Sequence, residues 1–99
     1  MSSINSHVVR SYVMSKLDVD NLDHCFILHG TFDTPEKAIN CAKAIVDKWC
    51  IENVERFTCW NKMFADFAIN ADIPGISGVK YSVFSPIKYA EQKIKDYFK

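Results

Sequence analysis

Two histidines and a cysteine, side chains that often act as bases and nucleophiles, lie close together early in the chain. They are His24, Cys25 and His29. A Cys–His nucleophile needs the two side chains within hydrogen-bond reach and a third group that orients the base. This segment has the composition of a β-strand, where His24 and Cys25 point to opposite faces and Cys25 and His29 lie roughly 13 Å apart. We therefore keep a small enzyme or ligand-binding domain using these residues as an alternative and predict no catalytic residue.

The acidic residues Asp18, Asp20 and Asp23, just before this group, have a spacing similar to that of a calcium-binding loop. An EF-hand loop that began at Asp18 would require glycine at its sixth position and glutamate at its twelfth. Those positions hold Asp23 and His29, so the motif fails and an acidic connecting loop is expected.

The cysteines show no metal-binding spacing. They are Cys25, Cys41, Cys50 and Cys59. Zinc sites usually bring their ligands in close pairs, and no C-x-x-C pair occurs. The glycines are also too few and wrongly spaced for a phosphate-binding loop. We predict no metal and no cofactor, with reduced thiols in a cytoplasmic protein.

Lysines and aromatic residues interleave near the C-terminus, a composition that could serve nucleic-acid binding. The candidate lysines are Lys80, Lys88, Lys93 and Lys95. Binding to a phosphate backbone needs a concentrated basic surface, whereas arginine, the usual reader of phosphate and guanine, occurs only twice in the chain. A nucleic-acid-binding module that uses this helix face is the first alternative, ahead of the small enzyme or ligand-binding domain.

Residues 54–60 and 63–71 are predicted to form a hairpin around Asn61-Lys62, because asparagine tolerates the positive φ of a tight turn. Both alternating faces of this hairpin carry large apolar groups. One face should cover the helices, while the other is either further core, a homodimer contact or a partner surface. The candidate partner-binding residues are Phe57, Trp60, Phe64 and Phe67.

The remaining elements follow from local patterns. Residues 8–17 and 24–32 are predicted strands, because they are rich in β-branched and aromatic residues. Thr34-Pro35 is a typical helix start and is followed by apolar residues at helical spacing to about Cys50. Residues 72–78 are predicted to be a loop and 79–84 a strand. Ser85-Pro86 repeats the helix start for a C-terminal helix.

Composition limits the class of protein. The chain has 99 residues, 48% hydrophobic and 24% charged, with a formal net charge of zero. These values are typical of one small globular domain over residues 1–99, with residues 1–6 as a flexible tail. No apolar run approaches the roughly 20 residues of a membrane span. The predicted fold is α+β in the order β-β-α-β-β-β-α, a largely antiparallel sheet with two helices packed mainly on one face.

The function hypothesis follows from this lack of catalytic motifs. We expect a small intracellular protein-binding module, an adaptor, regulator or inhibitor such as phages and mobile elements encode. It would occlude or stabilise a protein partner through a sheet face, the predicted hairpin or an edge strand. Homodimer formation is a second use of the same surfaces, nucleic acid is a weaker expectation, and no membrane partner is expected.

Overall fold

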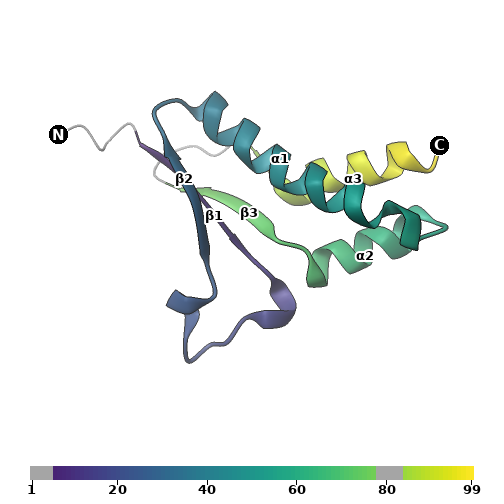
Figure 1. The fold of residues 1–99 in the computed structure, drawn as a ribbon, viewed down its shortest axis with the longest axis horizontal. Coiled ribbons are helices and arrows are strands. Elements are labelled where there is room, and N and C mark those ends of the chain that lie inside the picture. The colour runs from purple at the N-terminus through teal and green to yellow at the C-terminus, as the bar shows by residue number, and fades with distance from the viewer. Residues whose placement is uncertain (1–5, 78–83) are drawn as a thin grey trace.

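The computed structural model describes residues 6–77 and 84–99 and confirms an α+β fold with an antiparallel sheet (Figure 1). Its strands are β1 (His7–Tyr12), β2 (Ile27–Phe32) and β3 (Ile73–Ser77), and its helices are α1 (Pro35–Asn53), α2 (Trp60–Asn70) and α3 (Pro86–Tyr97). Short 3-10 turns η2 (Met14–Lys16), η3 (Leu22–His24) and η4 (Val54–Arg56) complete the order. The predicted tail lies almost wholly outside the described residues.

The sheet has β1 at its centre, in the order β2-β1-β3, and both neighbours run antiparallel to it. Val9 faces Gly30 on one side and Ile76 on the other. The β1–β2 register then shifts, so that Arg10 faces Leu28 and His29 is the extra residue of a β-bulge. The two predicted strands are confirmed in position but are shorter than expected.

Helix α1 begins as the sequence predicts. The Thr34 hydroxyl accepts a hydrogen bond from the Lys37 backbone N–H at 3.3 Å, and Pro35 occupies the first turn. Its buried positions recur every four residues, at Ala38, Ala42, Val46 and Cys50. This stripe packs on all three strands of the sheet.

The predicted hairpin is wrong, because residues 54–71 form the turn η4 and the helix α2. Met63, Phe67 and Ala71 follow at intervals of four and are all buried. That spacing is the period of a helix, in which these residues share one face, and tertiary burial outweighs the β preference of the residues before it. The described part of the chain therefore contains three α-helices, where the sequence predicted two.

The predicted loop at 72–78 is also wrong, since β3 covers residues 73–77. Pro74 and Gly75 suggested a break in structure, but β3 is an edge strand, where a missing N–H donor is tolerated. The predicted strand at 79–84 lies almost entirely outside the described residues, and its last residue, Phe84, is not in a strand.

Helix α3 starts at a serine cap, as predicted, with the Ser85 hydroxyl accepting from the Lys88 N–H at 3.3 Å. Its Ala90 and Ile94 are buried. Tyr89 donates to the Asp47 carboxylate at 2.7 Å and so joins α3 to α1. Burial is the main cause that raises the pKa of Tyr89 above its usual range, and the hydrogen bond to Asp47 is the next largest.

The core lies where the helices meet one another and β3. Its buried members are Val46, Cys50, Met63, Phe67, Ala71, Ile73, Ala90 and Ile94. The helices gather on one side of the sheet, whereas the connection between β1 and β2 projects away from them (Figure 1). The radius of gyration is 14.4 Å, against roughly 12.6 Å for a compact domain of this length.

Candidate partner-binding surface

The projecting segment, residues 13–28, is named the arm here, and its far end is held by an aspartate. The Asp18 carboxylate accepts hydrogen bonds from the Asp20 backbone N–H at 3.0 Å and from the Asn21 side-chain amide at 3.3 Å. The first is the bond of an Asx turn, in which the side chain replaces a backbone acceptor, and the second adds a side-chain contact in the same turn. No group of three or more potential metal ligands occurs within residues 6–77 and 84–99. The acidic run thus shapes the loop.

Cys25 holds the two sides of the arm together. Its Sγ accepts from the Asp18 backbone N–H at 3.3 Å and lies 3.4 Å from the Asn21 carbonyl oxygen and 3.7 Å from that of Lys16. A thiol is a weak donor and acceptor, and here both capacities go to the backbone. His24 is exposed and has no hydrogen bond to Cys25, both residues being described. The structure therefore brings Cys25 no imidazole base.

His29 has a different partner. Its Nε2 lies 2.6 Å from the hydroxyl oxygen of Ser11. Ser11 is fully buried, and a buried hydroxyl without a partner is costly. The β-bulge brings His29 to it. Because the Ser11 oxygen is sealed from solvent, the pair satisfies a buried polar group and does not present a nucleophile.

The arm concentrates exposed apolar side chains. Six of the ten exposed large apolar residues found in the described part of the chain belong to it: Met14, Val19, Leu22, Phe26, Ile27 and Leu28. Leu28 is 62% exposed and Ile27 54%. These two residues are consecutive in the edge strand β2, so their side chains point to opposite faces of the sheet. Leu28 pairs with Arg10 and Ile27 with Ser11 on β1. The edge strand is therefore apolar on both faces. Contiguous apolar surface of this kind usually marks an interaction site.

One hollow lies at the base of the arm and another between β2 and α1. One, of about 440 Å³, includes Val13, Ile27 and Asn70, and the other, of about 260 Å³, includes His29 and Trp49. Asp72 lines both hollows. Asp72 thus lies between two hollows whose walls carry both apolar and polar groups.

The aromatic residues singled out from the sequence lie elsewhere. Phe67 is fully buried, with its ring 5.4 Å from that of Trp49. Phe57, Trp60 and Phe64 are partly buried against the same core. The Lys95 ammonium lies 4.5 Å from the centre of the Trp60 ring and covers part of it. Phe67 cannot reach a partner in this structure, and the other three offer less surface than the arm.

The candidate lysines do not form one free basic surface. Lys80 lies outside the described residues. Lys88 is exposed, whereas Lys93 lies 3.6 Å from the Asp47 carboxylate and Lys95 lies 3.4 Å from that of Glu91. Two of the three described lysines thus have acidic neighbours, so we do not carry the nucleic-acid alternative further.

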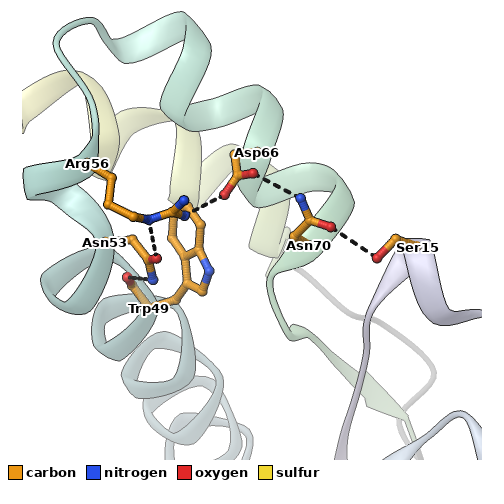
Figure 2. Close-up of polar contacts among 6 residues, drawn as sticks. All are labelled: Ser15, Trp49, Asn53, Arg56, Asp66 and Asn70. Atoms are coloured by element: carbon orange, nitrogen blue, oxygen red, sulfur yellow. Dashed lines mark hydrogen bonds and ion pairs between the residues drawn. The ribbon is translucent and has the colours of Figure 1, made fainter.

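A series of polar contacts joins the arm to the helices (Figure 2). It comprises the Trp49 carbonyl, Asn53, Arg56, Asp66, Asn70 and Ser15. Arg56 donates to Asp66 at 2.8 Å, Asn70 donates to the second Asp66 oxygen at 2.9 Å, and the Ser15 hydroxyl donates to Asn70 at 3.1 Å. Asn70 is therefore the link through which the arm is hydrogen-bonded to α2.

All four cysteines are free thiols. Within residues 6–77 and 84–99, none of the helices combines the length and the apolar character that crossing a bilayer requires. No protein-family model, curated protein or solved structure matches this chain.

Proposed function

We propose that this chain is a small protein-binding module, not an enzyme, and that the arm and the edge strand β2 form its docking surface. The observation that carries the proposal is the exposure of three consecutive apolar residues at the start of that strand: Phe26 is 44% exposed, Ile27 54% and Leu28 62%. Burying them against a partner removes apolar area from water, the dominant favourable term in protein association.

The partner binds as an added strand. Within the described residues β2 pairs with β1 alone, so its outward N–H and C=O groups are available to an extended segment. Natural edge strands are commonly guarded by charged residues or proline. Residues 26–32 contain neither a charged residue, histidine aside, nor a proline. The edge thus keeps few features that would repel a second strand.

The added strand would also find places for its side chains. The hollow containing His29 and Trp49 lies between β2 and α1, and the larger one lies at the base of the arm. Alternate side chains of a paired segment point to one face, and those on the helix side enter these hollows. Backbone pairing gives affinity, and the hollows give selectivity.

In this proposal the module acts by occlusion or stabilisation of the segment that it captures, as an adaptor, regulator or inhibitor does. The four free thiols are in keeping with work in the cytoplasm, where cysteines remain reduced.

The test is an affinity capture from the native host with two matched variants. Leu28→Lys places a charge on the docking surface, while Ile51→Lys places the same charge on α1 at a residue of similar exposure, 67%. We expect the wild type and Ile51→Lys to recover the same partner in stoichiometric amount and Leu28→Lys to lose it. Circular dichroism confirms that both variants fold. Equal recovery by the two variants contradicts the proposal.

Light scattering separates a foreign partner from a second copy of the chain. A monomer at micromolar concentration leaves β2 free, as proposed. A dimer that Leu28→Lys dissociates and Ile51→Lys does not would show that the captured segment is β2 of another copy.

A further inference from the structure

A third hollow, of about 210 Å³, lies on the sheet over β1 and β3, with Phe26 of the arm beside it. It is lined by Arg10, Tyr12, Phe26, Gly75, Ile76 and Ser77. Arg10 is exposed on the central strand, directly between Leu28 of β2 and Gly75 of β3. This volume is below the range of about 300–1,000 Å³ that encloses small-molecule ligands. It suits one side chain presented by a larger molecule.

Among the described residues that line this hollow, the one charged side chain is Arg10, a cation. Arg10 donates through Nη1 to the Ser77 hydroxyl at 3.3 Å. Within residues 6–77 and 84–99 no acidic side chain forms an ion pair with it. A guanidinium carries five N–H donors, so most of them remain for a ligand. The electrostatic complement of the hollow is therefore a single anion.

Two aromatic rings line one side of the hollow, and the space above Gly75 is unfilled. Tyr12 and Phe26 meet edge to face, with ring centres 5.7 Å apart, and so hold the aromatic wall in place. At Gly75 nothing lies within 4 Å of where a Cβ would be. The lack of a side chain there leaves the space that an incoming group would occupy.

We propose that this hollow binds the side-chain carboxylate of an acidic residue that is flanked by apolar residues in the partner. The inference rests on the proposed function, because Phe26 belongs both to this hollow and to the docking surface. In an extended segment the residues next to the acidic one face the opposite side of the sheet, where Ile27 of the same docking surface is exposed. One guanidinium and one hydroxyl match a carboxylate, whereas phosphate sites usually gather several cations or helix N–H groups. A chain-end carboxylate is usually bound in a nest of backbone N–H groups, and those of β1 are committed to two neighbouring strands.

The probe is the capped tripeptide N-acetyl-Leu-Glu-Leu-amide, titrated into the full chain and followed by the NMR signals of Arg10 Nε–H and the Gly75 and Ser77 amides. The same tripeptide with glutamine is its control. We expect saturable shifts with the glutamate peptide and about fivefold weaker binding of the glutamine peptide, near the upper limit for an exposed ion pair. Arg10→Gln should abolish this preference, and Lys62→Gln, which removes an exposed cation on α2, should preserve it.

Three results would overturn the carboxylate site: equal binding of the two peptides, a preference that survives Arg10→Gln, or tighter binding of inorganic phosphate or N-acetyl-leucine than of the glutamate peptide at equal ionic strength. If any of these occurs while Leu28→Lys still abolishes capture, the carboxylate site is wrong and the docking surface stands. If capture is insensitive to Leu28→Lys, the proposed function itself fails.

Discussion

The helices and the arm treat apolar side chains in opposite ways. In the helices the large ones interlock, and the exposed ones are scattered singly, as at Ile51 on α1 and Ile69 on α2. In the arm six face water and three of these, Phe26, Ile27 and Leu28, are consecutive, while the turn bonds of Asp18 and the thiol of Cys25 hold the backbone. The helices bury their large apolar residues in the core, whereas the arm leaves its apolar residues exposed on a backbone held by polar contacts. If the arm binds a partner as proposed, stability and recognition are located in separate parts of a small chain.

The largest expected effect tests the folding side of this comparison. Phe67→Ala removes a fully buried ring in contact with Trp49, and such a change costs about 3–5 kcal/mol. Urea unfolding followed by tryptophan fluorescence measures the loss. Leu28→Ser in the arm should change the free energy of unfolding by no more than about 0.5 kcal/mol. Comparable losses in the free energy of unfolding for Phe67→Ala and Leu28→Ser would show that the arm contributes to stability as much as the helices do.

A second prediction uses the pH dependence of the core. Burial raises the pKa of the Cys50 thiol from 9.0 to about 11. The Cys50 thiol therefore keeps its proton to higher pH in the folded chain than in the unfolded chain. Its contribution to the free energy of unfolding is complete below pH 9 and is lost between pH 9 and 11. The loss is roughly 2–3 kcal/mol at about 1.4 kcal/mol per pH unit.

The measurement is the free energy of unfolding of the wild type and Cys50→Ala in urea at pH 8, 9, 10 and 11. The variant should start lower, because a small cavity replaces the thiol, and should then decline less steeply. Tyr89 contributes to the decline of both proteins above pH 10, since its pKa is also raised. Parallel curves would show that Cys50 carries none of the dependence.

The smallest effect concerns the hydrogen-bonded link between the two regions. Asn70→Ala removes the bonds to Asp66 and Ser15 (Figure 2) and should lower the free energy of unfolding by less than about 1 kcal/mol, since the site is exposed. Hydrogen exchange should nevertheless become faster at residues 13–17, because the arm loses its attachment to α2. Arg56→Gln breaks the same series at its other end and should leave exchange in the arm unchanged. Equal exchange in both variants would mean that the arm is held by other contacts.

Much of the fold was accessible from the sequence where local signals and burial agree. Thr34-Pro35 and Ser85-Pro86 mark helix starts because a capping hydroxyl and a fixed φ act within one turn. The region 54–71 was misread because Phe57, Thr58 and Trp60 favour strands individually, whereas the four-residue spacing from Met63 to Ala71 decides the structure only when a core is present to bury it.

The candidate surface was harder to find. Phe26, Ile27 and Leu28 form an apolar run that a buried strand would also show. Their exposure depends on β2 lying at an edge, which is a property of strand order and not of the run itself. The absence of charge between Phe26 and Phe32 was the available signal, but it becomes informative only once the edge is known.

The bulge at His29 affects how many further strands can add in series to the edge strand β2. An extra residue increases the local twist of a strand and bends it, and flat sheets are the ones that stack without limit into fibrils. A twisted β2 can still accept one short segment while serving poorly as a template for an indefinite series of copies. We therefore expect the bulge that brings His29 to the buried Ser11 hydroxyl also to limit aggregation through this edge strand.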